Sequence, residues 1–341
     1  MKYDVTIGIP VYKSVDFIQR SLESALNQTY TSIEFLIVDD CGIDGSLDIV
    51  EQLRTNHPRG KDLFVIHHPQ NIGVSAARNR IIEEAHGDYL YFMDSDDVIS
   101  ENTIELLMHV VRQYDAEIVF GSYEKIEVSG RKIICQYPSL QLFQDDELAS
   151  FAYRKYAGIQ ASACNYLVKT SLLRAHNHRF IDTNYWEDFV FTFDLVTIIN
   201  RAILLPDITY TYLCRENSLS HYQERNQISK EEIMKNVHAI EHLKQTSSLL
   251  YNKVYFSNRC FNIMMTDFYI VCNILKRRDD IVPSFSKREL RDIMRSPLSF
   301  WETIFLKNRK LENLFLYMLG VLPPSLSVGI ITVLGKHKGL I

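Results

Sequence analysis

Hydrophobic and polar residues follow two alternating periodicities over the first hundred positions of the chain. Short runs of β-branched and aromatic residues, bounded by polar turns, predict buried strands. The segments between these runs repeat apolar residues at spacings of three and four, which is typical of helices packed on one face. Strands that alternate with helices favour a parallel sheet of right-handed βαβ units. The predicted strands of this half are residues 3–12, 33–40, 63–67 and 88–94.

The pattern changes twice further along the chain. Shorter strand-like runs and a helix around residues 186–199 indicate a second half of the same α/β domain. From about residue 229 the periodicity is helical throughout, and a stripe that includes Phe261 and Phe268 is typical of a helix-bundle core. We therefore expect three parts, at residues 1–124, 125–228 and 229–341.

Composition narrows the function before any motif is considered. The chain has 341 residues, of which 46% are hydrophobic and 23% charged, as expected of a globular protein. A net charge of −5 argues against nucleic acid as the main partner, because phosphate backbones need a basic surface. Six cysteines without CxxC spacing indicate free thiols in a reducing compartment. No signal-peptide pattern opens the chain, so we expect a cytoplasmic protein.

Acidic residues follow two of the predicted strands at the point where each strand ends. Two aspartates close the second strand, and Asp94, Asp96 and Asp97 close the fourth. Ligands of open α/β sheets bind at the carboxyl ends of strands, and clustered carboxylates repel one another unless a cation lies between them. A divalent cation that in turn holds a phosphate would satisfy this arrangement. The alternative is an acidic turn in which Asp97 or Ser100 caps the next helix.

Four sequence blocks resemble those of the family 2 glycosyltransferases of GT-A fold. They read IPVYKSVDFIQRSLESALNQTY, IEFLIVDDCGIDGS, NIGVSAARN and GDYLYFMDSDD, and their order and spacing match over about residues 4–100. One departure is local, because Gly42 and Ile43 occupy a turn where the family usually has Ser or Thr. The resemblance implies an α/β GT-A fold, with a Rossmann-like mixed sheet flanked by helices and followed here by the C-terminal helical region.

The same resemblance assigns residues that would bind a nucleotide-diphosphate sugar. UDP is the expected nucleotide, with GDP and dTDP as alternatives, and the metal would be Mn²⁺ or Mg²⁺. Tyr12 would stack on the base, and Arg215 would neutralise the diphosphate. Arg78 would contact the nucleotide, and an ion pair with Asp39 or Asp40 is the structural alternative. The implied nucleotide-binding residues are Pro10, Tyr12, Asp39, Asp40, Arg78, Asp94 and Arg215, and the implied metal ligands are Asp94, Asp96 and His221.

The WEDF segment at residues 186–189 resembles the catalytic acidic motif of the family. Asp188 would accept the proton of the acceptor hydroxyl as general base, and Glu187 would contact the acceptor or the donor sugar. The implied reaction is a single displacement that inverts the anomeric carbon. The acceptor would be a glycan or a lipid-linked oligosaccharide of cell-surface polysaccharide synthesis. The alternative for this segment is an acidic helix start that the helix dipole stabilises.

The last thirty residues combine an apolar segment with basic flanks. Residues 313–335 contain no charged side chain and are long enough in principle to cross a bilayer, but Pro323 and Pro324 interrupt them. Lys and Arg are frequent at residues 276–310, and two lysines follow the segment. We expect contact with an anionic membrane surface. Helices docked on the protein body, or self-association as a homo-oligomer, are the alternatives.

Three other function classes share parts of this pattern. A nicotinamide dehydrogenase needs a glycine-rich turn after the first strand, and the residues there are IPVYKSVD. A nucleotidyltransferase usually has a glycine-rich, basic phosphate loop near its start, which is missing here. A catalytically inactive sugar-nucleotide-binding or interaction protein would be expected to lose carboxylates at the DxD or WED positions, and this chain keeps both.

Overall fold

The computed structural model describes residues 3–154, 158–183, 186–215 and 227–341. The chain divides into two compact units. The first contains residues 1–148 and 161–218, and the second contains residues 149–160 and 219–341. The second unit therefore takes a short segment from within the sequence of the first.

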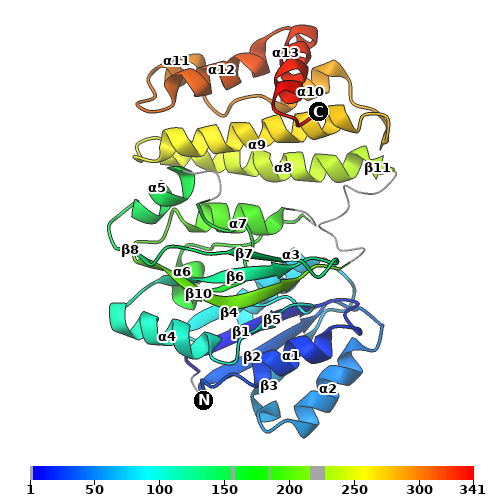
Figure 1. Cartoon of the computed structure of the whole chain (residues 1–341), viewed down its shortest axis with the longest axis vertical. Coiled ribbons are helices and arrows are strands. Elements are labelled where there is room, and N and C mark those ends of the chain that lie inside the picture. The colour runs from blue at the N-terminus through cyan, green and yellow to red at the C-terminus, as the bar shows by residue number, and fades with distance from the viewer. Residues whose placement is uncertain (1–2, 155–157, 184–185, 216–226) are drawn as a thin grey trace. The chain divides into compact units, whose positions relative to one another are not determined.

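The first unit is built on a ten-stranded mixed sheet (Figure 1). Four parallel strands lie in the order β3-β2-β1-β4, and antiparallel β9 pairs with β4 and leads to β6, β10 and β5. The two remaining strands pair at the margin, β7 with β6 and β8 with β10. The bounds are β1 (Val5–Val11), β2 (Ile33–Asp39), β3 (Leu63–His67), β4 (Tyr89–Phe92), β5 (Val98–Ile99), β6 (Ile118–Ile126), β7 (Lys132–Cys135), β8 (Leu140–Leu142), β9 (Tyr166–Lys169) and β10 (Ala202–Leu213).

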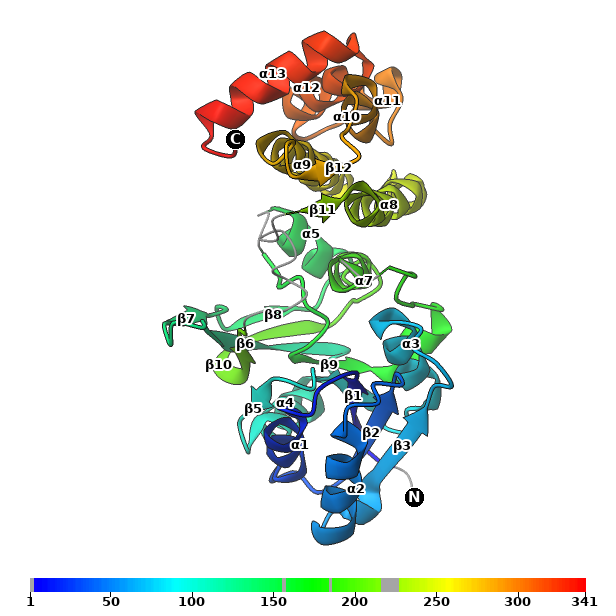
Figure 2. The ribbon, with the colours of Figure 1, turned by 90° about the vertical axis from the view of Figure 1, so that its right-hand side faces the viewer.

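Helices flank this sheet, as Figures 1 and 2 show. Their packing is tight where glycine allows it: a Cβ atom at Gly8 of β1 would lie 2.3 Å from Cγ2 of Ile81 in α3. The alternation of strands and helices and the mixed sheet confirm the predicted fold class. The bounds are α1 (Ile18–Leu26), α2 (Ser46–Asn56), α3 (Val74–Glu84), α4 (Thr103–Tyr114), α6 (Thr170–Ala175) and α7 (Glu187–Leu195), with a 3₁₀ turn η1 at Gly60–Asp62.

The second unit is mainly helical. Its long helices α8 and α9 contact each other, and α9 also contacts α12 and α13. Ser229, Ser286 and Ser299 each begin a helix with a capping box, which satisfies backbone amides at the helix start. The bounds are α8 (Lys230–Ser247), η3 (Ser248–Leu250), α9 (Phe256–Lys276), α10 (Lys287–Ile293), α11 (Phe300–Ile304), α12 (Lys310–Val321) and α13 (Pro324–His337), with the short strands β11 (Ile228–Ser229) and β12 (Ile281–Val282).

Helix α5 (Glu147–Arg154) supplies the first part of the segment that the second unit takes from the middle of the chain. Arg259 of α9 is fully buried and donates a 2.7 Å hydrogen bond from Nη1 to the Tyr153 hydroxyl. The amide of Asn262 donates to the Tyr153 carbonyl at 3.1 Å. Residues 149–154 and 158–160, which were expected in the acceptor half at 125–228, thus belong to the helical unit.

The apolar tail folds as two helices separated at the proline pair. Helix α12 ends at Val321, and α13 begins at Pro324. Proline at the first position of a helix is favoured, because the amide it lacks would have no intrahelical partner there. Within the described residues, no helix is long and apolar enough to cross a membrane.

Candidate active site

The acidic turn after β4 lies at the carboxyl edge of the parallel strands. The Asp94 amide donates to the Tyr210 hydroxyl at 3.1 Å, and the Asp94 carbonyl accepts from Ser21 Oγ at 3.1 Å. Ser95 and Ser14 join their hydroxyls at 2.7 Å. Side chains from α1, β10 and the loop after β1 therefore fix the turn, and they hold its carboxylates at the edge where ligands of such sheets bind.

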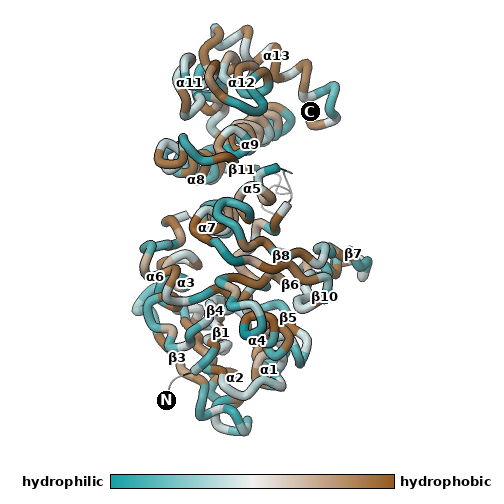
Figure 3. The backbone as a smooth tube through the Cα atoms, turned by 90° about the vertical axis from the view of Figure 1, so that its left-hand side faces the viewer, coloured by the Kyte–Doolittle hydropathy of each residue, from teal (hydrophilic) through white to brown (hydrophobic). Residues whose placement is uncertain are grey.

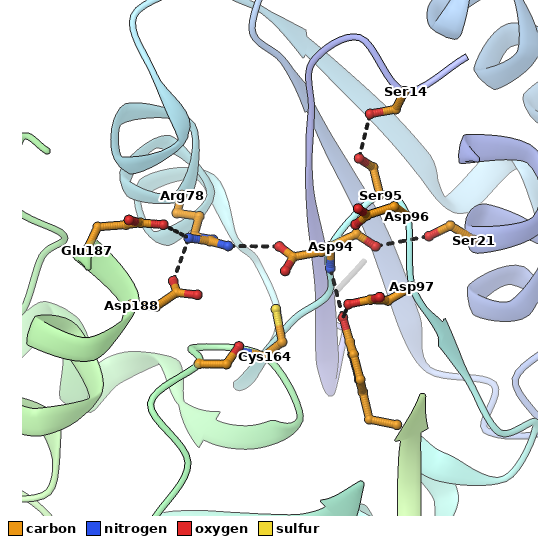
Figure 4. A network of polar contacts seen from close by, with 12 residues as sticks. Ser14, Ser21, Arg78, Asp94, Ser95, Asp96, Asp97, Cys164, Glu187 and Asp188 are labelled. Atoms are coloured by element: carbon orange, nitrogen blue, oxygen red, sulfur yellow. Dashed lines mark hydrogen bonds and ion pairs between the residues drawn. The ribbon is translucent and has the colours of Figure 1, made fainter. Parts of the chain in front are cut away.

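Arg78 lies at the centre of the site and binds three carboxylates (Figure 4). It comes from α3 and is only 3% exposed. Nη2 lies 2.8 Å from Asp94 Oδ1, while Nη1 lies 3.0 Å from Glu187 Oε1 and 2.5 Å from Asp188 Oδ1. One guanidinium thus joins the acidic turn after β4 to the acidic start of α7. The alternative prediction that Arg78 pairs with Asp39 or Asp40 is wrong, because its ion-pair partners are Asp94, Glu187 and Asp188.

Asp188 has an unusual electrostatic environment for a carboxyl group. Burial, together with the neighbouring charges of Glu187 and Asp94, raises its pKa to about 8, while Arg78 acts in the opposite direction. Three carboxylates share one cation, so the site has an excess of negative charge. An additional cation would relieve this repulsion.

Asp96 points to a different arginine. Its Oδ2 lies 2.7 Å from Arg215 Nη2, and the two side chains are 19% and 37% exposed. The Arg215 guanidinium also lies over the Phe17 ring at 4.6 Å. Burial raises the pKa of Asp96 and Asp94 adds to this, while Arg215 acts in the opposite direction. Asp96 and Arg215 are thus a partly accessible ion pair.

Asp97 anchors the turn to the sheet. Its carboxylate accepts hydrogen bonds from the Tyr210 hydroxyl at 2.8 Å and from the Leu213 amide at 2.9 Å, and both partners are on β10. Burial raises the pKa of Asp97 to about 8, and Asp94 and Asp96 contribute to the increase. The alternative of Asp97 or Ser100 as a helix cap is wrong, because α4 begins after Asn102.

The aspartates after β2 hold the neighbouring loops. Asp40 is 2% exposed and accepts from the amides of Ile72 and Gly73 at 3.0 and 2.9 Å, and His68 Nδ1 lies 2.8 Å away. Asp39 is 7% exposed, with its Oδ2 3.3 Å from Nδ1 of His67. The nucleotide roles of both aspartates stay predictions.

Two further predicted nucleotide contacts lie at the end of β1. Pro10 is buried in the strand, whereas Tyr12, just beyond it, is 44% exposed. An exposed aromatic ring next to a buried strand end is free to stack on a planar ligand. Base stacking by Tyr12 stays a prediction.

The carboxylates after β4 suit a hard divalent cation that a diphosphate also coordinates. Asp94 and Asp96 offer oxygen ligands, and Asp94 keeps 29% of its side chain exposed. Burial and then the charge of Asp94 raise the pKa of Asp96. Among the residues that the structure describes, no cluster of three His, Cys, Asp or Glu side chains could hold an ion by itself. Further oxygens would have to come from the ligand. His221 lies outside the described residues.

Two residues of the site have no role in the sequence analysis. Tyr210 binds both the Asp94 amide and Asp97, and Cys164 is buried beside the Arg78 cluster (Figure 4). Burial raises the pKa of the Cys164 thiol well above its usual value, and Asp94 contributes to this increase. Tyr210 begins the YTY run, and this aromatic pattern is the signal that could have identified it. A single buried cysteine gives no such signal.

Comparison with known proteins relates the N-terminal part of the chain to one family. Residues 6–167 match the family described as Glycosyl transferase family 2. The chain is also 33% identical over 129 residues to an uncharacterized glycosyltransferase of Haemophilus influenzae, a match that covers 38% of this chain and 50% of the relative. The family match covers 162 of the 341 residues, so the N-terminal part of the chain is similar to the family 2 glycosyltransferases.

Solved structures extend the fold similarity over nearly the whole chain. Residues 1–349 of S. aureus TarS in complex with UDP-GlcNAc have a TM-score of 0.60 at 17% identity, covering 99% of this chain and 92% of that fragment. A mannosyltransferase of Pyrobaculum calidifontis in complex with GDP-Man and Mn²⁺ has a TM-score of 0.52 at 13% identity, covering 98% of this chain and 88% of that one. At these identities the similarity concerns the fold alone.

Proposed function

We propose that this protein is a metal-dependent inverting glycosyltransferase. It moves a sugar from a nucleotide-diphosphate donor, in our proposal a UDP-sugar, to a hydroxyl group of the acceptor. The observation that carries the proposal is the Arg78 cluster, in which one buried guanidinium joins Asp94 of the DxD turn to Glu187 and Asp188. This cluster joins the turn that would bind the metal and the phosphates to the candidate base, at the carboxyl end of the parallel strands.

Asp188 acts as general base in this proposal. Its ionised carboxylate accepts the proton of the acceptor hydroxyl while the oxygen attacks the anomeric carbon from the face opposite the leaving group. Glu187 forms an ion pair with the same Arg78 nitrogen, Nη1, as Asp188 does. In this proposal it contacts the acceptor or the donor sugar. Arg78 is the positioning residue, because its bonds fix the direction of both carboxylates.

The ion pair between Asp96 and Arg215 prepares the site for a metal and a diphosphate. The two partners have opposite charges, and each suits one part of a metal–diphosphate complex. Asp96 and Asp94 would hold Mn²⁺ or Mg²⁺, and Arg215 would bind the diphosphate. The metal would polarise the phosphate oxygens. TarS with UDP-GlcNAc and the Pyrobaculum enzyme with GDP-Man and Mn²⁺ support this class of donor and metal.

The proposed acceptor is a glycan or lipid-linked glycan of cell-surface polysaccharide synthesis. The proposed place of action is the cytoplasmic face of the cell membrane, because a lipid-linked acceptor would be held there. The basic flanks of the apolar tail support this location. The chain spans half the length of the Haemophilus relative, and substrate and pathway are therefore part of the proposal.

Calorimetric titration tests the donor half of this proposal. The purified protein is titrated with UDP, GDP and dTDP, each with and without Mn²⁺. We expect metal-dependent binding of one nucleotide, and we expect Asp96→Ala to lose it. Absence of nucleotide binding in every condition would contradict the transferase assignment and would favour an interaction protein.

Asp188→Asn tests the chemical half with the sugar conjugate of the nucleotide that binds. We expect this variant to bind the donor with an affinity within about threefold of the native protein but to lose transfer by at least ~10². Near-native transfer by Asp188→Asn would remove Asp188 from the role of base.

A further inference from the structure

Helix α12 has apolar residues on the side that faces away from the bundle. It buries Leu316 and Leu319, while Leu311, Phe315 and Met318 are 77%, 44% and 37% exposed. The exposed residues are spaced by four and three positions, and they therefore share one face of the helix. A helix that packs on one side normally presents polar residues on the other. α12 does not follow this rule.

Helix α13 repeats the same arrangement. It buries Val328 and Ile331, while Leu326 and Val333 are 51% and 68% exposed. Gly329 faces open space on the same side. The two helices contact each other, no charged residue occurs at residues 313–335, and Figure 3 shows the hydropathy along both. We call the exposed residues Leu311, Phe315, Met318, Leu326 and Val333 the α12–α13 surface.

Aromatic side chains next to α12 enlarge the exposed apolar area. Trp301 of α11 and Phe305 just after it are 67% and 71% exposed, and α11 contacts α12. Tryptophan is enriched where protein meets the boundary between lipid headgroups and acyl chains. A large exposed apolar patch of this kind marks an interaction site.

The chain segment that carries this surface is rich in positive charge. Residues 276–338 contain 12 Lys and Arg against six Asp and Glu, although the whole chain has a net charge of −5. Three arginines in and after α10, a helix that contacts α13, lie 2.8–3.9 Å from the single carboxylate of Asp292. Lys310 precedes the uncharged segment, and Lys336 and Lys338 follow it. The charge of this segment therefore complements an anionic partner.

We propose that the α12–α13 surface docks on an anionic phospholipid membrane. Its apolar side chains enter the boundary between headgroups and acyl chains, and the flanking lysines lie at the lipid phosphates. This docking rests on the proposed function at the membrane, for which it names the lipid partner. The docking itself does not require sugar transfer. A second copy of the chain fits less well, because a two-fold contact would bring the basic flanks together.

Vesicle co-sedimentation of the full chain tests the proposal. The vesicles contain phosphatidylcholine alone or phosphatidylcholine with a third of phosphatidylglycerol. The test variant carries Leu326→Glu and Val333→Glu, two outward positions of α13. The matched control carries Val128→Glu and Leu249→Glu, which are also exposed apolar residues but lie outside the α12–α13 surface. Both variants change the net charge equally, and thermal melting checks that both fold.

We expect at least tenfold tighter binding to the anionic vesicles than to the neutral ones, and at least a tenfold loss in the test variant but not in the control. Equal binding by the test variant and the native chain, or no preference for anionic vesicles, would overturn the proposal. A third result would also overturn it: the native chain forms a dimer and does not bind vesicles, and the test variant is a monomer. That result would assign the surface to contact with a second copy. UDP titration of the same samples reports separately on the proposed transferase site.

Discussion

Arg78 shows how a single buried cation organises a site made of acids. Its guanidinium nitrogens are shared by Asp94, Glu187 and Asp188, so the three carboxylates can lie close together only because Arg78 lies among them. A buried ion pair gives little net stability, since desolvation offsets the attraction. The gain lies in geometry, because each carboxylate has a fixed direction.

This arrangement predicts a pH dependence. Asp188 must be ionised to accept a proton, and burial together with Glu187 and Asp94 raises its pKa to about 8. Transfer should therefore decline as the pH falls through that value, in the profile of kcat/KM that reports on the free protein. Glu187→Gln removes one like charge, and we expect the midpoint to move to lower pH by roughly one unit.

Glu83→Gln is the matched control for this experiment, because Glu83 is an exposed acid on the same helix as Arg78. Its profile should coincide with that of the native chain. An unchanged midpoint in Glu187→Gln would mean that Glu187 does not raise the pKa of the base.

At the scale of elements, the sequence predicts most of the fold and part of the site. The apolar runs that give β1, β2 and β4 are visible directly, because each of these strands is buried on both faces and its polar turn marks its end. The contact of Arg78 with Asp188 is not visible, because 110 positions separate the two residues. It depends on antiparallel β9, which lies beside β4. Strand order of that kind is not encoded in local periodicity.

Gly87 is closely packed and Gly329 faces open space, so alanine at the two positions should change the free energy of unfolding in opposite directions. A Cβ atom at Gly87 would lie 2.3 Å from the Thr6 backbone nitrogen, and backbone cannot move aside as a side chain can. Gly87→Ala should lower the free energy of unfolding by about 1–3 kcal/mol. Gly329, within α13, has nothing within 4 Å, and Gly329→Ala should raise the free energy of unfolding by roughly 0.5–1 kcal/mol.

Urea unfolding of the two variants beside the native chain measures both effects. The same glycine-to-alanine substitution should lower the free energy of unfolding at position 87 and raise it at position 329. A stabilised Gly87→Ala would show that β1 and the turn before β4 are less closely packed than the structure indicates.

At the scale of the whole molecule, the two units are interleaved along the chain. Ala149 and Tyr153 of α5 are buried at 0% and 1% exposure within the helical unit, where Arg259 binds the Tyr153 hydroxyl. A chain that ends at residue 228 would keep α5 but lose α9, and its apolar side chains would become exposed. We expect this truncated chain to aggregate.

A second truncated chain tests the cause. It also ends at residue 228, but a glycine-serine linker replaces residues 149–160. We expect it to remain in solution and to unfold cooperatively, as measured by size-exclusion chromatography and thermal melting. Equal solubility of the two truncated chains would show that α5 does not need the helical unit.

The position of α5 also limits how such proteins can be recombined. In a chimera joined near residue 228, Arg259 would come from one parent and Tyr153 from the other. The buried Arg259 would then face a partner residue with which it did not evolve. Exchange of the helical unit needs two coordinated segments, so natural shuffling and laboratory chimeras alike should favour breakpoints that keep α5 and α9 from the same ancestor.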